Sequence, residues 1–229
     1  MDDKLTRRGS LLKLAGLAGG VLGAGALKGA WLADEAEGGP AAVASGAVRC
    51  VLTPEQTEGP YYVAGERVRR NITEGRPGTP LALQLAVVNV STCKPIKGAA
   101  VDIWHCDASG IYSGVSGSTG TFMRGIQRTN ANGIATFRTV YPGWYMGRTV
   151  HIHVKVHVRG NVVHTGQLYF PDTLTDAVYR RAPYSSRPSR DTRNANDSVF
   201  RNGGRRSLLS LRRNSTGYLG TIRMGVHRS

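Results

Sequence analysis

The sequence predicts an all-β protein with an antiparallel β-sandwich core, an extended N-terminal arm and long irregular loops. Three observations support this prediction. Glycine is abundant, at 30 of 229 residues, and few long apolar runs occur outside the N-terminus. Residues 151–158, HIHVKVHV, alternate strictly between two kinds of side chain, which is the period of a strand. Several such short segments are separated by turn formers, which is typical of a sandwich.

The N-terminus has the features of an export signal. It combines a charged start, a twin arginine at Arg7 and Arg8, and a run of small and apolar residues. The stretch TRRGSLLK resembles the bacterial twin-arginine export signal. We expect cleavage after Ala44, so that residues 1–44 form the signal and 45–229 the mature domain, which is exported and keeps no stable membrane span. An uncleaved membrane anchor is the alternative, although the glycines make the run a poor span.

The first elements of the mature chain are an arm and two strands. Residues 50–80 carry glycine and proline with little periodicity, which indicates an extended arm laid over the core. Strands are expected at 81–90 and 99–106, with a turn between them. The segment 107–114 is rich in turn formers and is expected to be a loop.

The second half of the chain carries the clearest strands. We expect strands at 133–141 and 151–158, and a turn at Gly160–Asn161 leads into another strand at 162–170 to complete a hairpin. After Asp172 the sequence becomes irregular and basic. A last strand is expected within STGYLGTIRMGVHRS at the end of the chain.

The formal net charge is +15, and removing the signal leaves it unchanged because the signal carries five charges of each sign. A basic surface favours acidic partners such as nucleic acid or anionic lipid. The arginines cluster toward the C-terminus, but aromatic residues are not interleaved with them as stacking platforms require. We therefore expect a solvated basic surface and no specific nucleic-acid partner.

Three cysteines, Cys50, Cys93 and Cys106, leave one unpaired if a disulfide forms. Disulfides are permitted outside the cytoplasm. Cys106 lies inside an apolar strand and suits a buried thiol. We favour a Cys50–Cys93 bridge, with the other pairings left open by the sequence.

A cluster of metal-binding side chains begins at Tyr145. Arg148, His151 and His153 follow it closely, and both histidines point to one face of the predicted strand, where they can hold one metal ion. Carboxylates are scarce here, whereas tyrosines number nine. A phenol with a pKa of about 10 is a poor zinc ligand, but a hard trivalent ion can drive its ionisation. Histidines with tyrosinates therefore indicate ferric iron, with copper as the main alternative and ordinary hydrogen-bonding histidines as the interpretation without a metal.

Four motifs in this order resemble the intradiol ring-cleavage dioxygenases. They are W-x-x-D-x-x-G-x-Y at 104–112, P-G-x-Y at 142–145, R-x-x-H-x-H at 148–153, and Gln167 in GQLYF. The resemblance spans roughly residues 50–225. It implies an antiparallel β-sandwich with a mononuclear, non-haem Fe(III). It also implies an oxidoreductase of aromatic compound catabolism that cleaves catechol-type rings with O2 to cis,cis-muconate-type products.

The resemblance also implies roles for single residues. Four side chains match the iron ligands: Tyr112, Tyr145, His151 and His153. Tyr145 matches the ligand that substrate displaces and so has a catalytic role. Arg148 and Gln167 match catalytic residues that face the substrate. The stretch TEGPYY resembles an arm that closes over the active site, which makes Gly59 and Pro60 candidate substrate-binding residues.

Departures from the family pattern leave the substrate and the assembly open. The loop between Tyr145 and His151 is shorter than in the protocatechuate enzymes, and the helical dimerisation domain of the catechol 1,2-dioxygenase branch is missing. The preferred catechol is therefore not determined, and a homo-oligomer stays open. Two rival interpretations are an exported, non-catalytic transthyretin-like binding module and a copper or zinc enzyme at the same residues.

Overall fold

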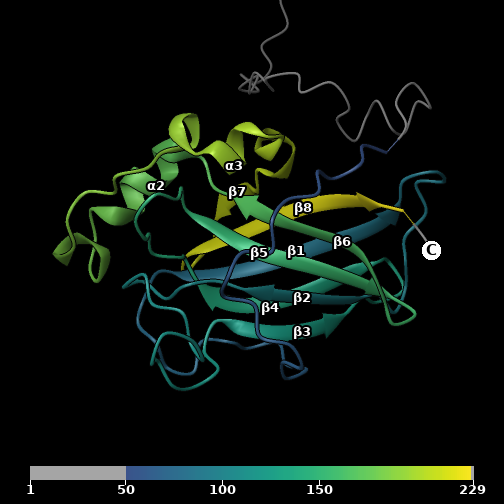
Figure 1. Ribbon diagram of the computed structural model, residues 1–229, viewed down its shortest axis with the longest axis horizontal. Coiled ribbons are helices and arrows are strands. Elements are labelled where there is room, and N and C mark those ends of the chain that lie inside the picture. The colour runs from purple at the N-terminus through teal and green to yellow at the C-terminus, as the bar shows by residue number, and fades with distance from the viewer. Residues whose placement is uncertain (1–49, 228–229) are drawn as a thin grey trace, which may run out of the picture. The chain divides into compact units, whose positions relative to one another are not determined.

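A computed structural model describes residues 50–227, so the predicted signal at 1–44 lies outside the described residues. The described part contains two four-stranded sheets and a few short helices (Figure 1). The prediction of a mostly β protein is therefore confirmed.

The two sheets use strands from different parts of the chain. The first sheet has the order β4-β1-β8-β7, with β1 (Pro80–Asn89), β4 (Ile134–Val140), β7 (Ser210–Arg213) and β8 (Tyr218–Val226). The second sheet has the order β3-β2-β5-β6, with β2 (Ala100–Trp104), β3 (Arg124–Arg128), β5 (His151–Val158) and β6 (Asn161–Tyr169). The strongly alternating strand at 151–158 and its hairpin partner thus lie in the second sheet.

The prediction of a purely antiparallel arrangement is wrong in the first sheet. Strand β8 runs parallel to β1, with Leu81 opposite Tyr218 and Asn89 opposite Val226. Antiparallel neighbours can be joined by a tight turn, but β1 and β8 are far apart in sequence and need no such turn. Strand β8 pairs antiparallel with β7, and this hairpin delivers it parallel to β1.

Side chains from both sheets form one hydrophobic core. Leu83 of β1 and Phe137 of β4 belong to the same buried cluster as Ile103 of β2 and Val154 of β5. Burying an aliphatic or aromatic side chain of this size stabilises the fold by about 1.5–3 kcal/mol. On β5 the core takes the even-numbered aliphatic residues, which leaves the odd-numbered, histidine-bearing face pointing away from it.

The arm covers that outward face of the second sheet. The Gln56 amide donates to the Thr165 carbonyl oxygen at 2.9 Å, and Val68 forms a bridge to Ile126 of β3. In Figure 1 the arm crosses the strands of this sheet as the dark blue segment. The predicted extended arm is confirmed, and it converts the outer face of β5 into a buried one.

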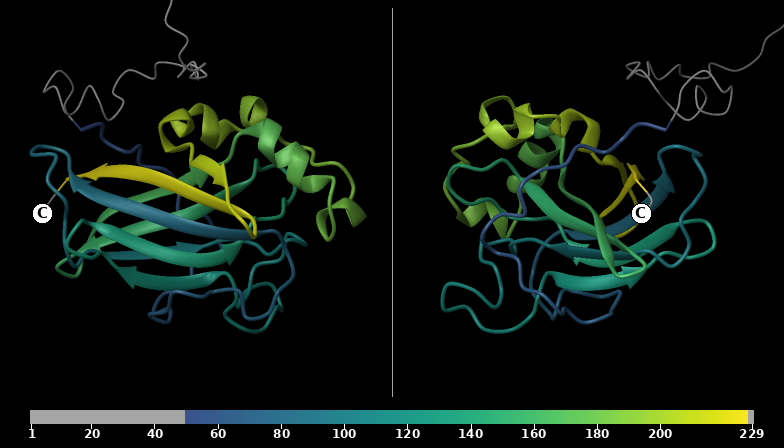
Figure 2. Two further views of the ribbon diagram at one scale, coloured as in Figure 1. Left: turned by 180° about the vertical axis from the view of Figure 1, so that it is seen from behind. Right: turned by 45° about the vertical axis from the view of Figure 1, so that its right-hand side comes forward.

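Several elements were not predicted from the sequence. Strands β3 and β7 are short and lack a clear alternation. After Phe170 the chain forms α2 (Asp172–Tyr179), α3 (Ser198–Arg201) and the 3-10 turns η1 (Tyr184–Ser186), η2 (Asn194–Asn196) and η3 (Gly204–Ser207). Figure 2 shows these helices gathered at one side of the sheets. Among the described residues, every helix is too short or too polar to pass through a bilayer.

A disulfide joins Cys50 to Cys93, with 5.4 Å between their Cα atoms. It ties the start of the arm to the turn that follows β1. Cys106 is buried and free. The favoured pairing is therefore confirmed.

Candidate active site

The histidines of β5 face one another beneath the arm. The Nε2 atoms of His151 and His153 are 3.1 Å apart, and both side chains are buried. Strand period places them on one face, and the β2 and β6 neighbours fix the strand from both sides. The indole of Trp104 stacks flat on His153, with ring centroids 4.9 Å apart. This stacking fixes the orientation of the imidazole.

Two loops bring tyrosines to these histidines. The loop before β5 places the Tyr145 hydroxyl 3.1 Å from His151 Nε2. The loop after β2 carries Tyr112, whose ring centroid lies 5.6 Å from that of Tyr145 and 6.2 Å from that of His153. The four predicted ligands, which are up to 41 positions apart (153 − 112), therefore lie together in space.

The hydrogen bonds show which atoms are free to bind a cation. His151 Nδ1 lies 2.6 Å from the Thr149 carbonyl oxygen, which can only accept, so Nδ1 carries the proton. The Nε2 lone pair of His151 is thus directed toward His153 and Tyr145. Burial first, and then the charge of Arg148, lowers the pKa of His151 to about 3, and burial lowers that of His153 too. Both imidazoles are neutral at pH 7 and suited to bind a metal.

The tyrosines are also strongly influenced by burial. Burial raises the pKa of the Tyr145 phenol to about 12, and burial also raises the pKa of the Tyr112 phenol well above its ordinary value. The buried Tyr112 hydroxyl has no partner with hydrogen-bond geometry among the described residues, although Tyr145 lies beside it. A cation close to both oxygens would satisfy the orphaned hydroxyl and offset the cost of ionising the phenols.

The donor set restricts the type of metal. Within residues 50–227, no three His, Cys, Asp or Glu side chains are grouped closely enough to hold a metal ion. The phenol oxygens of Tyr112 and Tyr145 are the further side-chain donors that lie beside the two histidines. Two imidazole nitrogens and two phenol oxygens fit a hard, trivalent ion better than zinc, because the ion must drive phenol ionisation.

Arg148 and Gln167 lie beside this cluster and contact each other. The Arg148 NH2 group donates to Gln167 Oε1 at 2.5 Å, and Gln167 Nε2 donates to the Thr57 carbonyl oxygen at 3.0 Å. Gln167 on β6 is opposite His153 on β5, which explains its position. The Gln167 side chain is buried. Through its two hydrogen bonds it links the arm to the Arg148 guanidinium.

The arm residues have different surroundings. Gly59 has a φ of +72°, and a Cβ at this position would lie 3.2 Å from His153 Cε1, so the close approach of the backbone requires glycine. Pro60 is exposed. The ring of Tyr61 stacks on that of Tyr112 at 4.4 Å between centroids. Tyr61 was not among the predicted site residues, although it directly follows Gly59 and Pro60 in the stretch TEGPYY.

A cavity of about 550 Å³ opens onto the tyrosines. Tyr112 and Tyr145 form part of its wall, and Tyr61 and Ile111 form apolar parts of it. Arg76 also lines the cavity and stacks on Phe122 at 3.8 Å from the ring centroid. Gly59 and Pro60 do not line this cavity, so their predicted contact with substrate stays a prediction.

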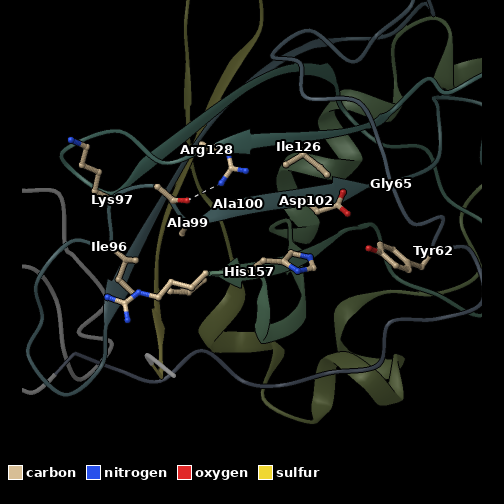
Figure 3. A pocket seen from close by; sticks show the side chains of 14 residues that line it. Tyr62, Gly65, Ile96, Lys97, Ala99, Ala100, Asp102, Ile126, Arg128 and His157 are labelled. Atoms are coloured by element: carbon tan, nitrogen blue, oxygen red, sulfur yellow. Dashed lines mark hydrogen bonds between the residues drawn. The ribbon is translucent and has the colours of Figure 1, made fainter.

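A second cavity, of about 430 Å³, lies on the same face of the second sheet (Figure 3). Asp102 of β2 and Tyr62 of the arm lie side by side at one end, and the His157 ring of β5 points toward that end. Burial raises the pKa of the Asp102 carboxyl to about 7. Neither of its oxygens has a partner with hydrogen-bond geometry among the described residues, although the Tyr62 hydroxyl is nearby. This cavity is separate from the four-residue cluster.

Comparisons with known proteins define the family. A family model described as "Dioxygenase" matches residues 57–182, which is more than half of the chain. The solved structure of an intradiol ring-cleavage dioxygenase from Tetranychus urticae is 39% identical, with a TM-score of 0.75, and the match covers 78% of this chain and 95% of that chain. The dioxygenase domain of a dioxygenase carbohydrate-binding protein fusion from Streptomyces sp. SirexAA-E is 34% identical, with a TM-score of 0.61, over 78% of this chain and 100% of that chain. The chain belongs to the intradiol ring-cleavage dioxygenase family.

Curated relatives include enzymes named for catechols. Catechol 1,2-dioxygenase 1 from Acinetobacter lwoffii is 35% identical over 101 residues, which are 41% of this chain and 32% of that protein. Chlorocatechol 1,2-dioxygenase from Pseudomonas sp. (strain P51) is 31% identical over 135 residues, which are 49% of this chain and 53% of that protein. The chain thus spans between a third and about half of the length of these curated relatives.

Proposed function

We propose that this chain is a mononuclear, non-haem Fe(III) intradiol dioxygenase that cleaves catechol-type rings with O2. The observation that carries the proposal is the gathering of four donors from three segments of the chain: Tyr112, Tyr145, His151 and His153. Family membership and the catechol-cleaving relatives agree with it. Ferric iron, when bound, would supply Lewis acidity and draw electron density from a catecholate.

The remaining chemistry belongs to side chains of the chain. Tyr145 lines the cavity and would act as a general base once a bound cation has ionised it, because its phenolate oxygen could then take a proton from a substrate hydroxyl. Arg148 carries a fixed positive charge and would stabilise negative charge that develops on the ring, an effect worth a few kcal/mol. Gln167 would hold the guanidinium and orient the substrate through its amide. The arm covers this face of the sheet and would limit the access of water.

The substrate is proposed to be a small catechol, with a cis,cis-muconate-type product. The cavity of about 550 Å³ exceeds the needs of a single ring, so it has room for substituents beside Ile111 and Val115. We also propose that the two sheets with their shared core form a β-sandwich, supported by the mixed membership of the core cluster.

Export by the twin-arginine route is proposed as well. The Cys50–Cys93 bridge supports it, because disulfides persist in oxidising compartments. Fusing residues 1–44 to a reporter that works only outside the cytoplasm tests this proposal. A reporter that stays inactive because it remains in the cytoplasm, or one whose export survives replacement of both Arg7 and Arg8 by lysine, would contradict it.

The decisive experiment measures metal, colour and turnover on the purified protein. We expect one iron per chain, a broad visible charge-transfer band from the phenolates, and O2 uptake with catechol, 4-methylcatechol, protocatechuate or hydroxyquinol. The products should be of the muconate type. A colourless protein with stoichiometric zinc would exclude the ferric assignment, and extradiol products would exclude the reaction.

A further inference from the structure

The guanidinium of Arg148 is held by a carboxylate from a distant part of the chain. Arg148 Nε donates to Asp197 Oδ2 at 2.9 Å, and the Asp197 side chain is fully buried. Asp197 lies 49 positions further along, in the arginine-rich C-terminal segment. In the sequence this segment is irregular and basic, and no motif marks Asp197.

Asp197 uses each carboxylate oxygen for a different task. Oδ1 accepts from the backbone amides of Val199 and Phe200 at 2.7 and 3.0 Å, which caps the short helix α3. Oδ2 accepts from Arg148 Nε and from the Thr149 backbone amide, the latter at 2.8 Å. Cap formation requires only the first oxygen. The second oxygen is therefore available to fix the residues just before β5.

The two edges of the guanidinium are bound by different partners. Its Nε edge contacts Asp197 and its NH2 group contacts Gln167. An arginine side chain has about 2 kcal/mol of rotamer entropy, and contacts on two edges remove most of the freedom of a planar group. The orientation of the Arg148 guanidinium beside the four predicted ligands thus depends on the Asp197 carboxylate.

We infer that Asp197 is a positioning residue for Arg148, and that the C-terminal segment completes the candidate active site through it. This inference rests on the proposed function, in which Arg148 stabilises charge on the substrate ring. Neither Asp197 nor Arg148 lines the cavity, and the contact of Asp197 with the candidate site is its hydrogen bond to Arg148. It acts on turnover by holding Arg148 in one orientation.

An Asp197→Asn substitution separates the two tasks of the carboxylate. An amide has one acceptor oxygen, so it can cap α3 only by turning its NH2 group toward Arg148 Nε and the Thr149 amide. Donors then face donors, and Arg148 loses its anchor while the helix cap is kept. If the amide oxygen instead turns toward Arg148, the hydrogen bond to Arg148 is kept and the cap of α3 is lost. The lost cap then lowers the free energy of unfolding.

The test is a double-mutant cycle with Arg148→Ala on the full iron-loaded protein. We expect D197N to lower kcat roughly 10- to 100-fold with a change in KM below about threefold, because the lost interaction acts on the transition state. In the R148A background the same substitution should change kcat less than about twofold. A D197N effect of equal size in both backgrounds would show a merely structural role and overturn the inference.

Matched controls separate folding from positioning. Asp176 is another carboxylate that pairs with arginines, at 2.8 Å from Arg190 and 2.6 Å from Arg193, outside the candidate site. D176N should leave kcat within about twofold of wild type. D197N should keep the iron content of the wild type, and its urea unfolding curve should show a fully folded protein under the assay conditions despite the loss of the buried ion pair. If D197N fails to fold, D197E, which keeps the charge and moves it by one methylene, replaces it in the cycle.

A crystal structure of D197N distinguishes this inference from the proposed function. If the wild type cleaves no catechol, the proposed function fails, yet the position of Arg148 can still be observed. We expect the guanidinium to leave Gln167 in the variant. An Arg148 side chain that keeps its wild-type contacts without Asp197 would overturn the positioning role.

Discussion

At the scale of single residues, the two tyrosines that begin and end YPGWY have different surroundings. The Tyr141 hydroxyl is bonded to Thr175 in the core at 2.8 Å, whereas the Tyr145 hydroxyl points to His151. The motif P-G-x-Y ends on Tyr145, which is the tyrosine that the resemblance assigns to the metal. The distances give a physical reason for that assignment, because Tyr141 already has its partner.

We expect Tyr145→Phe to change the visible band and to lower kcat at least about 100-fold, since both a phenolate and a general base are lost. Tyr141→Phe is the matched control. It should cost about 1 kcal/mol in unfolding free energy through the lost hydrogen bond, with the colour unchanged. Absorption spectra and steady-state kinetics check both. A Y145F protein with the wild-type spectrum would remove Tyr145 from the metal site.

The buried carboxyl of Asp102 should make the stability of the folded protein depend on pH. Its pKa is raised by burial to about 7, above the value of about 3.9 in an unfolded chain. The folded state therefore holds this proton more tightly, and its stabilising effect is complete below about pH 4 and lost as the pH rises through about 7. Asp102→Asn removes the effect because an amide does not titrate.

The measurement is urea unfolding of wild type and D102N between pH 4 and 8. We expect the stability difference to move in favour of D102N with rising pH, by on the order of 2–4 kcal/mol. Buried neutral histidines such as His105, whose pKa burial lowers to about 4, oppose this trend equally in both proteins. If the stability difference between the wild type and D102N does not change between pH 4 and 8, the pKa of Asp102 is not raised in the folded protein.

At the scale of elements, strand β5 and the arm form the site together. Alternation along 151–158 predicted one apolar and one polar face, and the apolar face is indeed in the core. The same alternation normally marks a solvent-exposed face for the polar residues. Here the arm buries these polar residues, and the sequence pattern of β5 does not predict that burial.

The arm is tested by comparing two glycines with similar backbones. Gly59 and Gly65 have φ of +72° and +79°, but only at Gly59 would a Cβ contact His153, since nothing lies within 4 Å of one at Gly65. Both alanine variants should lose about 1–2 kcal/mol through the left-handed conformation. Only G59A should also shift the visible band and lower turnover. Equal spectra in the two variants would show that the arm does not contact His153, the proposed metal ligand.

At the scale of the whole molecule, the disulfide restrains the arm relative to the first sheet. It closes a loop of 43 residues between Cys50 and Cys93. Loops of this size are typically worth about 2–4 kcal/mol, largely through the unfolded chain. We expect the C50S/C93S pair to lower the unfolding free energy by this amount.

Urea unfolding with and without a thiol reductant gives the measurement. C106S is the control, because Cys106 is free and buried and reductant has no bond to break there. Reductant should destabilise the wild type and C106S alike and leave C50S/C93S unchanged. A wild type that is insensitive to reductant would show that the bridge does not form or does not restrain the chain.

The sequence by itself determined the mostly β class, the hairpin formed by 151–158 and 162–170, and the candidate ligands, because these depend on local period, turn chemistry and motifs. It missed β3, β7 and the helices after Phe170, whose short segments carry little local signal. Only the tertiary structure decided that β8 runs parallel to β1, that Tyr61 faces Tyr112, and that Asp197 anchors Arg148. These are contacts between distant parts of the chain, and their energy is gained only when the sheets and the arm have packed together.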